Sequence, residues 1–490
     1  MSLPLRFLPR PRAKPSPKLS RGGALVNRIT GIETEYGCLV SDDAPQNTSD
    51  SWPVRIKNHL FKKDRVGAVD LHYRDYEEPP GNGGFLRNGG RLYVDMGHLE
   101  YASPECLSVR DMVAFDLAGD AMVQSAITAL RAESRVALIK NNVDHHTGAT
   151  FGCHENYLMR REMQFTPPAL GTLLSFLATR QIYTGAGRVG QTNPLSFEYE
   201  SKQSSRVDFQ ISQRADHIVN DIYQWVQFNR AIINARDEPL ADHHRFRRLH
   251  LLLGDSNMSP FATALKVGLT SLVLTLIEQD CLPHDVVLRD AVIATREISR
   301  EGTGRGVVKL ENGRTRDALD IQYEFLSHAQ RYFTGADEET DWLLQSWQFV
   351  LEALESHPER LIGGVDWISK RWLLDLFRAS EKLSWQDPWL QSLDLEYHNI
   401  DPARGLFFTL KPDDWIADWN AKVSSIEAQY IPPANTRAHG RGIAVNWFLD
   451  HPKSSYLINW DSISIDGNPP LAMGDPFDSS EAQVRKFLAG

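Results

Sequence analysis

ITGIETEYGCLV, at residues 29–40, is the stretch from which the architecture of this protein can be worked out. Its residues alternate with a period of two and end in apolar side chains, which predicts a β-strand. Side chains on a strand alternate between its two faces, so Glu33 and Glu35 project from one face and mainly apolar residues from the other. Paired carboxylates suit Mg²⁺, which prefers hard oxygen ligands. A solvated strand face produces the same pattern.

A second group of polar residues follows at 91–105, RLYVDMGHLEYASPE. Its first six residues predict another strand, on which Arg91, Tyr93 and Asp95 share a face, and Glu100 follows a glycine-containing bend. An arginine can hold phosphate, one carboxylate can act as a base and another can hold a metal, which are the parts that phosphoryl transfer needs. A purely structural ion pair of Arg91 with a neighbour is the alternative.

A third polar group lies in residues 148–159, which also read as a strand. His154 and Asn156 share one face of it and Glu155 takes the other. A single histidine is more often a satisfied polar group than a ligand, so the pattern alone leaves both readings open.

Basic and glycine-rich segments complete the candidates. Arg236 and the run RRLH at 247–250, before GDSN at 254–257, could meet an anionic substrate, and surface ion pairs explain them equally well. GAGRVG at 185–190 matches the pattern of dinucleotide-binding loops, but it follows a predicted helix and precedes polar residues, so the context of a Rossmann fold is missing. The sequence contains no GxxxxGK[ST] phosphate loop.

Composition limits the class of protein. The 490 residues are 42% hydrophobic and 24% charged, enough for a sizeable core and two or three domains. The net charge is −10, and because residues 1–28 carry +7, the remainder carries −17, which argues against nucleic-acid binding as the main role. Residues 1–27 contain five prolines among basic residues and predict an extended, disordered tail.

Four widely spaced cysteines without a CxxC pair favour a reducing compartment. No apolar run approaches a membrane span by inspection, and the N-terminus lacks the apolar core of a signal peptide. We therefore expect a cytoplasmic protein without a membrane partner.

The rest of the chain predicts an α+β protein whose second half is mainly helical. A change of pattern near residues 432 and 433 marks the start of a small C-terminal domain with short strands at 456–465 and a helix after 479. The remaining predicted helices lie at residues 111–131, 218–229 and 261–278 and across a Trp-rich region at 316–380.

Taken together and in order, these motifs closely resemble the Pup ligase and Pup deamidase/depupylase family. The resemblance runs from about Arg28 to the C-terminus, and co-linear motifs make it specific. The segments that carry it are GIETEYG, FLRNGGRLYVD, EYASPE, FGCHENYLM, INARDEP, RRLHLLLGDSNMS and VDWISKRWLL. It implies a glutamine synthetase-like, curved antiparallel sheet that cradles ATP at 28–430, after the tail at 1–27, and a small C-terminal domain at 431–490.

The resemblance also implies a reaction. In the family's ligases, ATP phosphorylates the side-chain carboxylate of the C-terminal Glu of Pup, a small disordered ubiquitin-like protein. The amine of a target lysine attacks the acyl phosphate and an isopeptide bond forms. The implied cofactors are ATP and Mg²⁺, and the implied partners are a Pup-like modifier, lysine-bearing targets and, indirectly, the proteasome.

Residue roles follow from the matching motifs and stay implications of the resemblance. Asp95 would be the base that deprotonates the lysine. The metal site would use Glu33, Tyr93 and Glu100, with Glu35 and His154 as further candidates, and the nucleotide would be contacted by Arg91, Ser103, Trp460 and Arg236.

The two branches of the family catalyse opposite reactions, and the sequence has features of both. FLRNG, GIETE and GDPF at 474–477 resemble the ligase. The five positions from Asp95 to Glu100, SPE, HENYLM and LSW at 383–385 resemble the depupylase. The 60 positions from Glu35 to Asp95 fall between the two. We predict a ligase, with the deamidase/depupylase as the alternative.

Overall fold

The computed structural model describes the chain from residue 27 to residue 489, apart from short internal gaps. The described ranges are 27–41, 48–74, 78–145, 148–163, 165–191, 207–224, 230–410 and 425–489. The predicted disordered tail at 1–27 therefore lies outside the described residues, except for its last position.

A large sheet dominates the described part of the chain and confirms the α+β class. Its ten strands pair antiparallel, except for the parallel pair β10 and β11 at one edge. In spatial order they are β10 (Asn220–Tyr223), β11 (Ala231–Asn234), β12 (Phe246–Leu251), β7 (Cys153–Arg160), β1 (Thr30–Val40), β5 (His98–Ala102), β4 (Arg91–Asp95), β3 (Gly83–Leu86) and β2 (Gly67–Val69), with β6 (Val136–Ile139) paired to the far end of β1.

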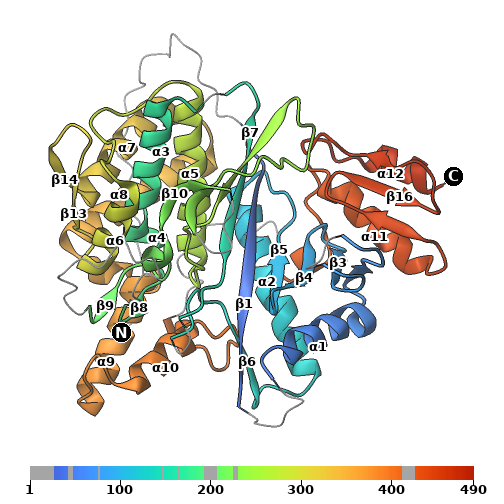
Figure 1. Cartoon of the computed structure of the whole chain (residues 1–490), viewed down its shortest axis with the longest axis horizontal. Coiled ribbons are helices and arrows are strands. Elements are labelled where there is room, and N and C mark those ends of the chain that lie inside the picture. The colour runs from blue at the N-terminus through green and yellow to red at the C-terminus, as the bar shows by residue number, and fades with distance from the viewer. Residues whose placement is uncertain are drawn as a thin grey trace.

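Strand β1 is the predicted strand, and it runs through the middle of the molecule (Figure 1). Its inward side chains are buried in alternation, which confirms that Glu33 and Glu35 share the more open face. In the register, Glu35 lies opposite Glu100 on β5, and Glu33 lies opposite His154 on β7. The central strand thus brings the three polar groups of the sequence onto one sheet.

Helices pack against the apolar face of the sheet, on which Ile32 and Tyr36 lie. Helix α2 packs with α5 in the main hydrophobic core and with α1 in a second core cluster, and α1 and α5 lie on opposite sides of β1 in the view (Figure 1). These helices are α1 (Ser51–His59), α2 (Val109–Ala129), α3 (Pro167–Thr179), α4 (Gln181–Thr184), α5 (Pro260–Glu278), α6 (Ala291–Glu301), α7 (Ala318–Phe333), α8 (Glu338–Ser356), α9 (Asp366–Glu381) and α10 (Pro388–Tyr397). Shorter helical segments are the π-helix η1 (Leu60–Asp64) and the 3₁₀ helices η3 (Ala215–His217), η4 (Pro358–Leu361), η5 (Leu406–Leu410) and η7 (Glu427–Gln429). Two hairpin-like pairs join them, β8 (Arg188–Val189) with β9 (Phe209–Gln210), and β13 (Val307–Lys309) with β14 (Thr315–Asp317).

The C-terminal segment packs on the far edge of the sheet (Figure 1). It consists of α11 (Ala438–Asp450), the strands β15 (Tyr456–Ile458), β16 (Ser462–Ile465) and β17 (Leu471–Ala472), and α12 (Glu481–Leu488). The predicted short strands and terminal helix are confirmed, whereas α11 has no counterpart in the prediction. Its core includes Ala68 and Phe85 from β2 and β3, so this segment shares a hydrophobic cluster with the large sheet.

Three expectations need correction. The helix predicted at 218–229 is wrong, because residues 220–223 form the edge strand β10, whose side chains alternate between half-buried and exposed. The strand predicted from residue 148 begins only at Cys153. Helix α5 is long and apolar enough by composition to cross a membrane, although 94% of its most apolar window is buried inside the protein. Residue type alone does not show whether such a helix faces lipid or a protein core.

Candidate active site

Three carboxylates meet where β1, β4 and β5 lie side by side. The oxygen atoms of Glu35, Asp95 and Glu100 all come within 4.8 Å of one another. Burial raises the pKa of Glu100 well above its ordinary value, and the charges of Glu35 and Glu33 raise it further. Such crowding is unfavourable unless a cation neutralises it. The set of oxygen donors therefore fits a hard divalent cation such as Mg²⁺.

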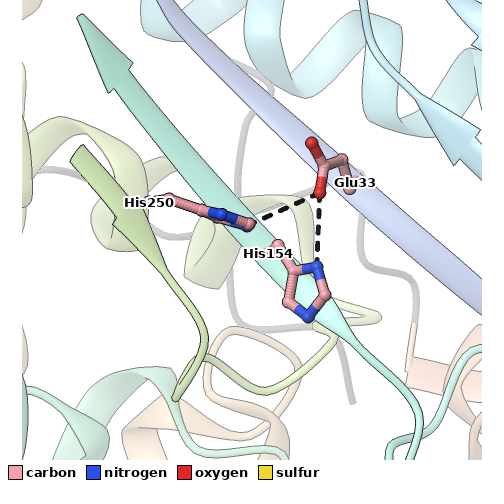
Figure 2. A group of neighbouring side chains, drawn as sticks. All are labelled: Glu33, His154 and His250. Carbon is pink, nitrogen blue, oxygen red and sulfur yellow. Dashed lines mark hydrogen bonds and ion pairs between the residues drawn. The ribbon is translucent and has the colours of Figure 1, made fainter. Parts of the chain in front are cut away.

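A second group lies beside the first, on three neighbouring strands (Figure 2). It contains Glu33 from β1, His154 from β7 and His250 from β12, whose ligand atoms also lie within 4.8 Å of one another. Glu33 Oε2 is 3.2 Å from His154 Nδ1 and 3.7 Å from His250 Nε2. The buried Nε2 atoms of both histidines have no hydrogen-bond partner among the described residues. This donor set also fits a divalent cation.

The ionisation states of the second group also favour the binding of a divalent cation. Burial lowers the pKa of His250 to about 3, so its imidazole is neutral near pH 7 and has a lone pair to offer. The pKa of Glu33 lies well below its ordinary value although burial opposes ionisation, because the hydrogen bond with His154 and the charges around it favour the carboxylate. A neutral imidazole and an ionised carboxylate are the forms that bind metals.

His250 was missed as a ligand by the sequence reasoning, which treated residues 247–250 only as a basic run. Its position depends on the pairing of β12 with β7, where His250 lies opposite Asn156. The only sequence signal is a histidine on a strand, and that signal does not say which strand lies beside it.

Tyr93 supports the acidic group from the side. Its hydroxyl donates a hydrogen bond to Glu100 Oε1 over 2.6 Å. Burial and the nearby Glu100 raise the pKa of Tyr93 well above its ordinary value, so the phenol keeps its proton and acts as a donor. Tyr93 thus contacts one of the metal-binding candidates and restrains the orientation of its carboxylate, and its place at a metal site stays a prediction.

The two arginines predicted to contact nucleotide have carboxylate partners in this structure. Arg91 is buried and pairs with Asp70 at 3.0 Å and with Glu78 at 2.5 Å, so the structural ion pair considered above is present. Arg236 is exposed and pairs with Glu238 at 3.6 Å. A nucleotide contact of either arginine stays a prediction.

A pocket open to solvent lies beside the second group of metal-binding candidates, which contributes Glu33 to its wall. Glu33 and Ser103 line it from the sheet, and Trp460 lines it from the C-terminal segment. Ser103 Oγ accepts a hydrogen bond from the backbone of Ile32 over 2.9 Å. Two of the predicted nucleotide residues therefore share one pocket wall with a predicted metal ligand.

Arg437 also lines this pocket and was missed by the sequence reasoning. It lies directly before α11, and its Nε donates to Glu105 Oε1 over 2.7 Å. Arg441, one helical turn later, also pairs with Glu105 and places its guanidinium 4.7 Å from the centre of the Trp460 ring. Because α11 itself was not predicted, nothing in the sequence pattern indicated this cluster.

The comparisons with known proteins agree with this geometry. A family model described as Pup-ligase protein matches residues 28–464. The chain belongs to this family. It is 37% identical over 488 residues to the Pup–protein ligase of Corynebacterium efficiens, with 95% of each chain covered. It is 35% identical to the Pup–protein ligase of a Nocardioides species, covering 94% of this chain and 99% of that protein.

Solved structures of Pup-ligase family members resemble the fold across nearly its whole length. The complex between Pup and its ligase PafA matches with a TM-score of 0.81 at 34% identity and covers 95% of this chain and 92% of that one. The ligase PafA in complex with ADP matches with a TM-score of 0.74 at 35% identity and covers 93% and 95%. The family predicted from the order of the motifs is confirmed.

Proposed function

We propose that the protein is an ATP-dependent ligase that joins the side-chain carboxylate of a C-terminal Glu, on a Pup-like modifier, to lysine amines of target proteins. The observation that carries the proposal is the placement of Asp95 within the acidic group of metal-binding candidates, next to the second group, whose Glu33 lines an open pocket. The named relatives are Pup–protein ligases, and the similar solved structures contain Pup in one case and ADP in the other.

Different residues of the chain would serve the two steps of the reaction, phosphoryl transfer and amine attack. Glu35 and Glu100 would hold one Mg²⁺, and Glu33, His154 and His250 a second divalent cation. When bound, these ions neutralise the negative charge of the phosphates during phosphoryl transfer. The pocket lined by Ser103 and Trp460 would bind ATP and keep its terminal phosphate pointed toward the carboxylates.

Asp95 would act in the second half of the reaction. It ends strand β4, is half-buried, and precedes a two-residue turn formed by Met96 and Gly97. An approaching lysine amine can reach this position from solvent. The amine nitrogen attacks the carbonyl carbon of the acyl phosphate, inorganic phosphate leaves, and Asp95 accepts the proton that the nitrogen loses. Tyr93 keeps Glu100 in place through its hydrogen bond.

A conjugation assay tests the proposal. The purified protein is incubated with ATP, Mg²⁺, a modifier that ends in Glu and a lysine-bearing target. We expect a covalent conjugate together with ADP and phosphate. A protein that forms no conjugate but cleaves a preformed one would instead be the hydrolase.

One observation favours that second candidate, a deamidase or depupylase of the same modifier. The hairpin between Asp95 and Glu100 is tight, with Asp95 paired directly to His98 in the register. The short spacing resembles the depupylase branch. The discriminating observation is the C-terminal residue of the cognate modifier, because a ligase needs Glu and a deamidase needs Gln.

The proposed setting is the cytoplasm, where the conjugates would be delivered to a proteasome. Free thiols support this compartment, since all four cysteines are unpaired.

A further inference from the structure

Two segments far apart in the sequence meet at the mouth of the pocket. The first is residues 239–246, which lead into strand β12. The second is residues 474–477, the GDPF motif that the proposed chemistry does not use. Pro239 and Leu240 line the pocket from the first segment, and Pro476 lines it from the second. We call these two segments together the clasp.

Three contacts hold the clasp closed. The backbone amide of Asp242 donates to the carbonyl oxygen of Gly474 over 2.9 Å. Arg245 Nη1 donates to Asp475 Oδ2 over 2.8 Å. The rings of Phe246 and Phe477 lie 5.9 Å apart.

The clasp contacts are weak in comparison with those that anchor the same segment. The side chains of Arg245 and Asp475 are 53% and 37% exposed, and an ion pair in such surroundings contributes little to stability. By contrast, Arg437 is buried, pairs with Glu105, and donates through Nη1 to the carbonyl oxygen of Met473 over 3.1 Å. The backbone amide of Arg437 also donates to the carbonyl oxygen of Pro476 over 3.2 Å. The GDPF segment is therefore fixed firmly, whereas residues 239–245 are half-buried or exposed and are held to it loosely.

We propose that the clasp opens to allow nucleotide to enter and leave the pocket, and closes over the bound nucleotide. The proposal rests on the proposed function, because it takes the ligand of this pocket to be ADP or ATP. A purine nucleotide in the pocket would contact Pro239 and Leu240 of the first segment and Pro476 of the second, all of which line it together with Trp460. Breaking these three contacts frees the first segment from the second without disturbing the buried pair of Arg437 with Glu105. The expected consequence is that the strength of the clasp sets the rate of nucleotide release.

The chain offers a position at which the clasp can be locked. A β-carbon added to Gly474 would lie 3.8 Å from the β-carbon of Asp242, which is close to the mean separation in disulfides. The backbone of Gly474 has a negative φ, so a cysteine is tolerated there without strain. The double variant Asp242→Cys with Gly474→Cys therefore forms a reversible lock, and each single cysteine variant is its control.

The test measures release of a fluorescent ADP analogue, loaded with Mg²⁺ and then chased with excess ADP. We expect oxidation to slow release from the double variant by at least about tenfold and a reductant to restore it, with no change in the single variants or in the oxidised wild type. Equal release rates from the oxidised and reduced double variant would overturn the proposal that the clasp controls release, and would leave the proposed function standing. A wild-type protein that takes up no ADP would overturn the proposed function and the clasp with it.

A charge swap tests the same proposal without new covalent bonds. Arg245→Glu and Asp475→Arg should each speed release about 2- to 5-fold, and the combined variant should return toward the wild-type rate. Arg314→Glu is the matched control, because Arg314 forms an equally exposed ion pair with Asp285 that lies remote from the pocket. Single variants with unchanged release, or a double variant without recovery, would contradict the proposal.

Discussion

Removing the carboxylate of Glu105 should cost the protein a large part of its stability. Glu105 is buried at the end of the sheet and joins it to the C-terminal segment by pairing with Arg437 and Arg441. The change Glu105→Gln keeps the size of the side chain, removes its charge, and leaves two buried guanidinium groups without their anionic partner. A broken buried pair of this kind is strongly destabilising.

The magnitude follows from the pKa of the carboxyl group. Burial opposes its ionisation, but the charges of Arg441 and Arg437 outweigh burial and lower the pKa of Glu105 from 4.5 to about 2. A difference of about 2.5 pKa units corresponds to about 3 kcal/mol. Because the folded-state pKa is the lower one, this stabilisation is complete above about pH 5 and is lost as the pH falls from there to about 2.

Urea denaturation at pH 7 provides the assay. We expect Glu105→Gln to lose about 3 kcal/mol of unfolding free energy and to release ADP faster, since Arg437 lines the pocket. Glu481→Gln is the control, because Glu481 forms an exposed pair with Arg485 at 2.9 Å and should change stability by less than about 1 kcal/mol. A loss below about 1 kcal/mol for Glu105→Gln, or a wild-type stability that stays constant between pH 5 and pH 2, would refute the reasoning.

Three further predictions concern the site. His250→Ala should raise the metal concentration needed for half-maximal activity about 10- to 100-fold, measured by titration with Mg²⁺ or Mn²⁺. The control His357→Ala changes an exposed histidine and should leave this concentration unchanged. Equal titration curves for the two variants would exclude His250 from the metal site. Asp95→Asn should lower the conjugation rate about 10²- to 10⁴-fold and preserve ADP affinity, and retention of full activity would exclude it as the base. Gly152→Ala should lower the conjugation rate about 100-fold, because its β-carbon would collide with the Glu35 carboxylate, and a normal rate would show that Glu35 can move freely.

Much of the site could be predicted because strand periodicity is local. The alternation around Glu33 and Glu35 and the short spacing from Asp95 to Glu100 place side chains on faces without knowledge of the rest of the chain. The order of the motifs then indicated the family, the ligase reaction and most of the candidate residues. The edge strand β10 escaped prediction because its few apolar residues fit a helical pattern equally well.

The sequence by itself determined which side chains share a strand face and which family the chain belongs to. Only the tertiary structure decided that His250 completes the group around Glu33. The reason is that His250 reaches this group through the pairing of β12 with β7, two strands about 90 residues apart in the chain. It also decided that Arg91 is paired and that Gly474 lies beside Asp242. Local pattern fixes the direction of a side chain, whereas packing of distant segments selects its partner.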